Sequence, residues 1–378
     1  MSSPDDEFRA ELRSWLAQHR APPVDVASTR KDAETLRAWQ RTMYADRWVG
    51  VHWPAEYGGR AASVTQVAIY NEELARAGVP PFLGRAGITL VGPTLMAHGR
   101  DEQRARWMPR ILSGDDVWCQ LFSEPGAGSD LASLATRAEK SGGVYRVNGQ
   151  KVWSSYATFA DMGIALVRTD PSSPPHKGMS MLAIPMDAPG IDVRPLRQMT
   201  GDFEFNEVFF DDVVVPVENL IGPEHGGWRV ANTTLANERG ASFIWKEQVL
   251  HEVVVDRLTN ECSRRGSTRD PRVRQRLAQS WIDGEIFRLH NARMLERLAR
   301  GEEIGAESSI VKLFWAASSQ RLADTAVALL GPDALLTPAP WANRLLATRA
   351  NSIMGGTSEI QRNVIGERLL ALPREPAI

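Results

Sequence analysis

The sequence FSEPGAGSD occupies residues 122–130, and KVWSS follows it at residues 151–155. The first segment holds one proline and two glycines within four positions, a combination that stops both helices and strands. It is therefore a loop, in which glycine lets the backbone approach a ligand closely. Ser123 and Ser129 add hydroxyl groups that can donate to carbonyl or phosphate oxygens.

The second segment places a large aromatic side chain, Trp153, next to the hydroxyl groups of Ser154 and Ser155. An indole ring can cover one face of a flat heterocycle while hydroxyl groups bond to its edge. The alternative is that Trp153 is a core residue, because tryptophan is often simply buried.

A third segment, MGGTSEIQR, lies at residues 354–362. Taken alone, it predicts a turn into a helix, with Thr357 or Ser358 as the N-cap and Glu359 in the first turn. Residues 122–130, taken alone, are equally consistent with an ordinary glycine-rich turn.

The three segments together resemble the motifs of the acyl-CoA dehydrogenase family. That family usually carries a T/S-E-P-x-A-G-S-D loop and a K-x-W-x-S/T strand that bind flavin, and a G-T-S-x-I-Q-R segment near the C-terminus. Here they occur in the same order across about 240 residues, and the resemblance covers nearly the whole chain. It implies bound FAD and an acyl-CoA thioester as substrate.

The resemblance also implies roles for single residues. The backbone and hydroxyl near Phe122 and Ser123 would contact the flavin ring and its ribityl chain. Trp153 would lie beside the isoalloxazine, and Ser155 would bond near its N5. The implied cofactor contacts are Phe122, Ser123, Gly128, Ser129, Trp153, Ser155, Arg274, Gly331, Thr357 and Glu359. The implied substrate contacts are Ser129, Arg239, Gly355 and Gly356.

Glu238 is the candidate catalytic residue. A helix predicted from residue 228 carries positions that step by three or four residues and share one face: Ala231, Leu235, Glu238, Ser242, Trp245 and Val249. An unpaired carboxylate in this apolar stripe normally protonates or finds a partner. Glu238 is therefore either a boundary residue with a salt bridge or a general base with a raised pKa. Arg239 points elsewhere, because adjacent helical side chains do not face each other.

The resemblance favours the general base. In many family members the base is a glutamate directly before the Gly-Thr-Ser of the C-terminal segment, and here that position is Gly355. A second subgroup carries its base on a helix at the position of Glu238, followed by arginine as here. We therefore predict Glu238 as the base. The N–H of Gly355 would then help to polarise the thioester carbonyl, as in an oxyanion hole.

One segment departs from the family pattern. Many members bind FAD across a subunit interface through Q-x-x-G-G-x-G, whereas residues 328–334 read ALLGPDA and keep only Gly331 of the three glycines. This indicates a subclass, and it leaves the adenosine half of the FAD site open. Arg274 is the expected phosphate contact from a neighbouring subunit. The alternative is that it belongs to a solvated basic helix face.

Composition sets the broad class. The 378 residues predict two or three domains, and 43% hydrophobic with 24% charged residues is ordinary for a globular protein. A net charge of −2 argues against nucleic acid or an anionic membrane as the main partner. No apolar run reaches the ~18–20 residues of a membrane span. Cys119 and Cys262 suggest neither a disulfide framework nor zinc. The acidic N-terminus lacks the pattern of a signal peptide, so we expect a cytoplasmic protein.

The periodicity changes twice along the chain and predicts three domains. Residues 1–117 are expected to be helical, 118–225 a small antiparallel β-barrel, and 226–378 a four-helix bundle, an α+β order that matches the acyl-CoA dehydrogenase fold. Asn148-Gly149, between VYRV and QKVW, predicts a hairpin turn. Further strands are predicted at 164–167, 179–184, 191–195 and 208–215. Long helices are predicted at 228–263, 271–300, 307–330 and 358–371.

The implied reaction is α,β-dehydrogenation of an acyl-CoA to the trans-2-enoyl-CoA. Glu238 would take the α-proton while a hydride leaves the β-carbon for the flavin. Electron-transferring flavoprotein would be the acceptor, and the assembly a homotetramer or at least a homodimer. The alternatives are an oxidase or dehydrogenase of a carrier-protein thioester, and a non-catalytic subunit of a hetero-oligomer. Such subunits typically lose the base or the flavin motif, whereas this chain keeps Glu238, Trp153 and Ser129. Branched, long and ring-bearing acyl groups are all compatible.

Overall fold

A computed structural model describes residues 3–24, 26–238, 241–336 and 340–374, with the backbone alone at 238 and 241–244. The chain forms two compact units. The helical unit comprises Met1–Arg20, Ser63–Val79 and Arg239–Ile378, and the sheet unit comprises Ala21–Ala62 and Pro80–Glu238. The helices predicted for residues 1–117 are thus divided between the units. The predicted domain boundaries at 117/118 and 225/226 stay predictions.

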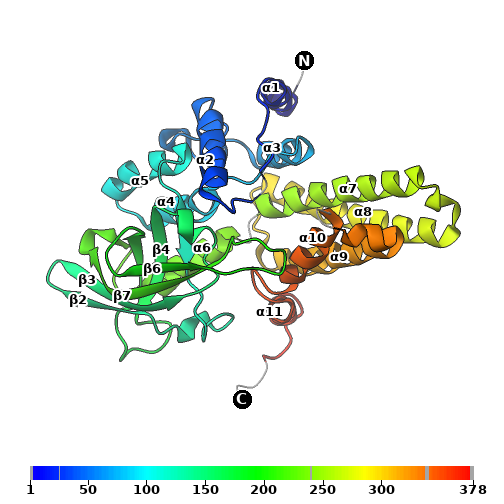
Figure 1. Cartoon of the computed structure of the whole chain (residues 1–378). Helices are drawn as coiled ribbons and strands as arrows, with labels where there is room; N and C mark the ends of the chain where they lie inside the picture. Colours follow the sequence, from blue (N-terminus) through cyan, green and yellow to red (C-terminus); the bar gives the residue numbers. More distant parts are fainter. Residues whose placement is uncertain (1–2, 25, 239–240, 337–339, 375–378) are drawn as a thin grey trace. The chain divides into compact units, whose positions relative to one another are not determined.

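The sheet unit is built on one eight-stranded sheet, drawn in green in Figure 1. Its strands are β1 (Trp118–Leu121), β2 (Arg137–Ser141), β3 (Val144–Lys151), β4 (Met162–Arg168), β5 (Met179–Pro185), β6 (Ile191–Pro195), β7 (Asn206–Pro216) and β8 (Leu220–Ile221). They lie in the order β6-β7-β3-β2-β4-β5-β8, with β1 paired to β4. All four strands predicted between residues 164 and 215 are confirmed.

The prediction of a purely antiparallel barrel needs correction. β4 pairs with both β1 and β2 in the parallel sense, so the sheet is mixed. Along the described pairings it runs open from β6 to β8. Parallel neighbours need a crossover between them, and the chain from β1 to β4 supplies one through the 122–130 loop and the β2–β3 hairpin.

The hairpin predicted at Asn148-Gly149 is wrong. β3 runs straight through these residues, and the β2–β3 turn lies at Gly142-Gly143 instead. The register of β3 against β7 shifts between Val147 and Gly149, which marks a bulge. A Cβ on Gly149 would lie 2.6 Å from Thr136 Oγ1, so glycine here serves a close backbone approach.

The sheet unit also contains helices. These are α2 (Arg30–Ala45), a π-helix at Gly87–Val91, α4 (Gly92–His98), α5 (Asp101–Ser113) and α6 (Gly227–Glu238). β4 is buried along nearly its whole length, as expected for a strand covered on both faces, and α6 packs against β4 and β5. The Trp53 indole donates to Ile88 O at 3.1 Å within the π-helix, so this buried side chain holds the start of α4 in place.

The helical unit contains the long helices at the right of Figure 1. Its helices are α1 (Pro4–Gln18), α3 (Val64–Arg76), α7 (Ala241–Arg264), α8 (Pro271–Ala299), α9 (Ser308–Leu330), α10 (Pro340–Ala347) and α11 (Ser358–Val364). The helices predicted at 271–300 and 307–330 are confirmed. The one predicted at 228–263 corresponds to α6 and α7, with residues 239–240 outside the described part of the chain. The one predicted at 358–371 is shorter, because α11 passes into a π-helix at Ile365–Leu369.

The core of the helical unit lies where α7, α8 and α9 pack together. Leu258, Cys262, Leu322 and Ala326 are buried there. Cys119, in the sheet unit, is also buried, and both cysteines are free thiols. No helix within the described ranges is long and apolar enough to cross a membrane.

Candidate active site

The first two motifs lie against each other in the sheet unit. Val152 N donates to Ser123 O at 2.9 Å, and Lys151 Nζ donates to Phe122 O at 2.9 Å. The loop at 122–130 is therefore fixed to the end of β3. The two segments, which 20 residues separate in the sequence (131–150), form one structural element.

A buried ion pair holds this element together. Lys151 is fully buried, and its Nζ lies 2.8 Å from Glu124 Oε1. The same carboxylate accepts hydrogen bonds from Ala135 N and Thr136 N at 2.6 and 2.9 Å. Burial lowers the pKa of Lys151 to about 8 against the opposing pull of Glu124. Burial alone would raise the pKa of Glu124, but the Lys151 charge and the hydrogen bonds lower it overall. A buried charge needs such partners, because ions are costly to remove from water.

Two glycines of the 122–130 loop have open space around them. Glu124 and Ala127 exchange two backbone hydrogen bonds and close a tight turn over Pro125-Gly126. A Cβ added at Gly126 or Gly128 would meet nothing within 4 Å, and neither residue has the left-handed backbone that requires glycine. Packing within the chain therefore does not explain these two glycines, whereas close approach of a ligand does.

Trp153 follows the strand end that holds this loop, and its ring is exposed. Its side chain is 60% exposed and its backbone adopts a left-handed conformation, with φ of +62°. The ring meets Phe205 edge to face at 5.9 Å. The alternative of Trp153 as a core residue is therefore wrong. A strained backbone that exposes a large aromatic side chain is the pattern expected where a ligand is clamped.

The hydroxyl groups beside Trp153 differ in their surroundings. Ser155 is half-buried, as is Ser123, while Ser129 is exposed. Ser154 is buried, and its Oγ has no hydrogen-bond partner among the described residues. An exposed indole, open space over Gly128 and accessible hydroxyls fit a flat heterocycle with a polar chain. The residues present therefore fit the flavin that the resemblance implies.

Helix α6 carries the predicted base at its end and is anchored firmly within the sheet unit. Thr94 Oγ1 and Thr234 Oγ1, both buried, lie 2.8 Å apart and join α6 to α4. His98 Nε2 lies 2.8 Å from Thr233 Oγ1. Burial and the charge of Arg229 lower the pKa of His98, so the neutral ring takes part in this contact. These contacts fix the position of the helix on which Glu238 is the last residue.

The Glu238 side chain itself, and Arg239 as a whole, lie outside the described residues. On the predicted apolar face, Ala231 is buried and Leu235 half-buried, and Trp245 and Val249 are buried on α7. These residues belong to two helices in different units, so the single shared face stays a prediction. Its role as base stays a prediction.

The third motif forms a loop in the helical unit. Gly355 and Gly356 both adopt left-handed backbone, with φ of +63° and +88°. Thr357 is the N-cap of α11, and its Oγ1 accepts from Ile360 N at 3.2 Å, which confirms the first of the two predicted caps. Glu359 is exposed in the first turn. The glycines here are required by the backbone, in contrast to those at 126 and 128.

Arg274 and Gly331 also lie in the helical unit. Arg274 is exposed near the start of α8, and its Nη1 donates to Thr268 O and Arg269 O at 2.9 Å. Gly331 ends α9 with φ of +65°, as expected for a helix stop. Their cofactor roles stay predictions. The predicted site residues thus fall in two units: those of the first two motifs lie in the sheet unit, and Arg274, Gly331 and the third motif lie at different places in the helical unit.

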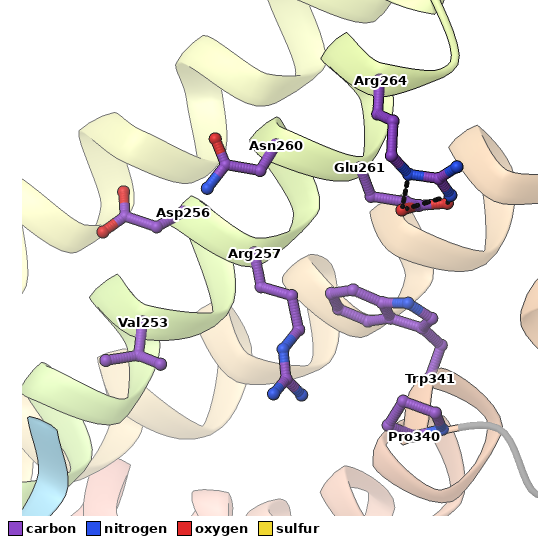
Figure 2. Close-up of a pocket in the computed structure, with 8 residues that line it drawn as sticks. All are labelled: Val253, Asp256, Arg257, Asn260, Glu261, Arg264, Pro340 and Trp341. Carbon is purple, nitrogen blue, oxygen red and sulfur yellow. Dashed lines mark hydrogen bonds and ion pairs between the residues drawn. The ribbon is translucent and has the colours of Figure 1, made fainter. Parts of the chain in front are cut away.

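A separate cavity of about 710 Å³ lies between α7 and α10 (Figure 2). Arg257 extends into it beside Trp341, while Arg264 and Glu261 form an ion pair at its edge. None of the predicted site residues lines this cavity. We therefore do not assign it to the dehydrogenation.

The sequence analysis missed the residues that hold the two loops. Lys151 and Glu124 do so in the sheet unit, and Lys312, described below, in the helical unit. The sequence contained a signal for Glu124 and Lys151, because these residues lie inside the motifs at 122–130 and 151–155. Lys312 has no such signal, since it lies in an unremarkable helix more than 40 residues before the loop.

Comparisons with known proteins agree with this geometry. The N-terminal, middle and C-terminal domains of acyl-CoA dehydrogenase match residues 2–115, 119–213 and 225–370. Acyl-CoA dehydrogenase IpdE1 of Mycobacterium tuberculosis is 39% identical over 98% of both chains. Acyl-CoA dehydrogenase FadE34 of the same organism is 40% identical over 85% of this chain and 44% of the relative.

Two solved structures share the fold. The Tcur3481-Tcur3483 steroid ACAD matches with a TM-score of 0.89 and 29% identity over 99% of both chains. The ChsE4-ChsE5 complex from Mycobacterium tuberculosis matches with a TM-score of 0.85 and 31% identity, covering 100% of this chain and 99% of the other. The predicted order of a helical region, a sheet domain and a second helical region is thereby confirmed. This chain belongs to the acyl-CoA dehydrogenase family and is an oxidoreductase that acts on acyl-CoA.

Proposed function

We propose that this chain catalyses FAD-dependent α,β-dehydrogenation of an acyl-CoA thioester. The observation that carries the proposal is the element formed by the 122–130 loop and Trp153. This element exposes an aromatic ring and glycine backbone with open space around it, and the buried Lys151–Glu124 ion pair holds it in place. When bound, FAD supplies the two-electron acceptor for the hydride from the β-carbon, and the product is the trans-2-enoyl-CoA.

The residues of the chain position the substrate and move the proton. Glu238 accepts the α-proton on its carboxylate, a role that suits a base on the predicted apolar stripe. N–H groups of the Gly355-Gly356 loop donate to the thioester carbonyl oxygen, which gains negative charge as the α-proton leaves. Ser129 and Arg239 hold the remainder of the thioester. Electron-transferring flavoprotein is the proposed acceptor of the electrons.

The proposed acyl group is bulky and bears rings. Support comes from the Tcur3481-Tcur3483 structure, which is named a steroid ACAD and covers this chain almost completely. Placing the base on a helix, as Glu238, is compatible with such a substrate. Straight-chain acyl-CoAs are the substrates with which ring-bearing acyl-CoAs are to be compared.

The experiment is anaerobic bleaching of the visible flavin band by a panel of straight, branched and steroid-derived acyl-CoAs. We expect one class to bleach the wild-type protein rapidly. Glu238→Gln should slow this bleaching about 10²–10⁴-fold, the usual contribution of a general base. Glu252→Gln on α7, which removes a carboxylate paired with Arg76, is the matched control and should bleach normally.

The other outcomes are equally informative. A yellow protein that no acyl-CoA bleaches would favour a carrier-protein thioester instead. A colourless protein would favour a non-catalytic subunit. A Glu238→Gln variant that bleaches at the wild-type rate would show that another group takes the proton.

We further propose that the chain works in an assembly with a second, different chain. The two solved relatives above are named as pairs, ChsE4-ChsE5 and Tcur3481-Tcur3483. α8 also exposes large apolar side chains along one side: Trp281, Ile282, Ile286 and Leu289. Exposed apolar surface of this kind marks interaction sites. The expected homotetramer or homodimer is therefore the alternative, and light scattering of the chain purified alone and with candidate partners distinguishes the two.

A further inference from the structure

Two buried side chains hold the Gly355-Gly356 loop in place. Lys312, on α9, donates from Nζ to Gly356 O at 2.7 Å and to Asn351 O at 2.9 Å. Gln361, on α11, donates from Nε2 to Gly355 O and Gly356 O, both at 3.2 Å. Both side chains are buried. The two consecutive carbonyl groups of the loop therefore point inward, toward α9 and α11.

This arrangement fixes the direction of the N–H groups. In a trans peptide the C=O and N–H point in opposite directions. Because Gly355 O and Gly356 O point inward, the N–H groups of Gly356 and Thr357 point away from Lys312. Within the described residues, neither N–H has a hydrogen-bond acceptor. Gly355, Gly356 and Thr357 are half-buried, so the loop is partly open to solvent.

The backbone conformation makes the arrangement depend on its supports. Two consecutive left-handed residues are a conformation that only glycine adopts readily. Glycine is also the most flexible residue, so the loop has many other conformations available unless side chains hold it. A charged donor forms stronger hydrogen bonds than a neutral one, which makes Lys312 the main support.

We propose that Lys312 is a positioning residue for the proposed reaction: by holding Gly356 O inward, beside the Gly355 O that Gln361 holds, it presents the Gly356 and Thr357 N–H groups to an anionic oxygen. That oxygen is either the thioester carbonyl as it gains charge or a phosphate of the dinucleotide. This inference rests on the proposed function, but the conformational part can be measured without turnover.

The test compares two substitutions on the same helix. Lys312→Met removes the ammonium group and keeps the length of the side chain. Gln320→Met is the matched control, because Gln320 Nε2 binds Thr348 O and Ser352 Oγ, in the turn before the loop, and neither glycine. Lys312→Arg restores the charge, and Gln361→Met provides an independent way to loosen the loop if Lys312→Met does not fold.

The first measurement is hydrogen exchange, which needs no substrate. Ile360 N and Gln361 N bond to Thr357 and report on the loop. In Lys312→Met they should exchange about tenfold faster, the scale of one lost charge-assisted hydrogen bond. In Gln320→Met they should be unchanged, and faster exchange should appear only around residues 348–354.

The second measurement separates the two sources of the anionic oxygen. A fall of about 10²-fold in kcat at full flavin content would assign the thioester, since small displacements of a catalytic group have effects of that size. Loss of flavin during purification, with normal kcat per bound flavin, would assign a phosphate. Lys312→Arg should recover part of either effect.

Three results would decide against the proposal or part of it. Unchanged exchange in Lys312→Met would overturn it entirely. Faster exchange with normal kcat and normal flavin content would leave Lys312 with a structural role only. A wild-type protein without turnover on any acyl-CoA would contradict the proposed function, while the exchange data would still decide whether Lys312 holds the loop.

Discussion

The loop at 122–130 and the loop at 354–362 are both rich in glycine, and both are held by a buried lysine. Lys151 meets a buried carboxylate, Glu124, whereas Lys312 donates to the backbone carbonyls of Asn351 and Gly356. The glycines differ as well. Gly126 and Gly128 have open space around them, while Gly355 and Gly356 have left-handed backbone.

The difference shows two separate uses of glycine near a ligand. In the first loop the absence of a side chain leaves room, and a side-chain ion pair supplies the rigidity. In the second loop glycine permits a conformation that directs N–H groups outward. Two loops of similar composition therefore use glycine differently. In one, glycine leaves room beside the backbone, and in the other it allows the backbone to direct its N–H groups outward.

The largest expected effect is on the ion pair of the first loop. Lys151→Met would leave Glu124 buried without its cation, and breaking a buried pair in this way typically costs about 3–5 kcal/mol. We expect a marked fall in the free energy of unfolding, measured by chemical denaturation. Lys140→Met, which breaks the largely exposed pair with Glu224, is the control and should change little. Equal stability of the two variants would show that Lys151 is dispensable.

The glycines give the next largest effect, as a matched pair. Gly356→Ala forces a side chain into left-handed backbone and within 2.6 Å of Gln361 Nε2, so it should destabilise the fold by about 1–3 kcal/mol. Gly128→Ala enters open space and should change stability by no more than about 0.5 kcal/mol. Gly128→Ala should instead weaken flavin retention, because its Cβ occupies the ligand's space. If Gly128→Ala proves the more destabilising of the two, the proposed distinction is wrong.

A smaller effect is expected from acid. The pKa of Glu124 is lower in the folded protein than its ordinary 4.5, so its stabilising contribution is present above about pH 4.5 and is lost as the pH falls through the folded pKa. Glu124→Gln should therefore flatten the fall of the unfolding free energy below pH 4.5. Glu56→Gln, which alters an exposed carboxylate outside both loops, should retain a fall close to that of the wild type. Parallel pH profiles for all three proteins would contradict this assignment.

The hairpin that was wrongly predicted at Asn148-Gly149 shows that a local sequence signal can be overridden by strand pairing. Asn148-Gly149 is a strong turn signal, yet β3 continues through it because it pairs with β2 on one side and β7 on the other. Pairing with strands on both sides outweighs the preference of two residues, even though the β7 ladder is bulged here. The glycine instead permits the bulge and the close approach of Thr136.

The sequence alone was enough for the family, for most of the helix and strand segments and for the two motif loops. These depend on local periodicity and on short motifs whose chemistry is visible residue by residue. The helix stop at Gly331 and a cap at Thr357 or Ser358 follow from such local rules, whereas the choice of Thr357 and the exposure of Trp153 came from the structure.

Only the tertiary structure decided what holds those loops. Glu124 and Lys151 are separated by 27 positions, and Lys312 and Gly356 by 44, so no local pattern connects them. Whether a lysine is a solvated surface charge or a buried support depends on which distant carbonyls and carboxylates the fold brings to it. Burial makes those contacts strong, because water no longer competes for the charge.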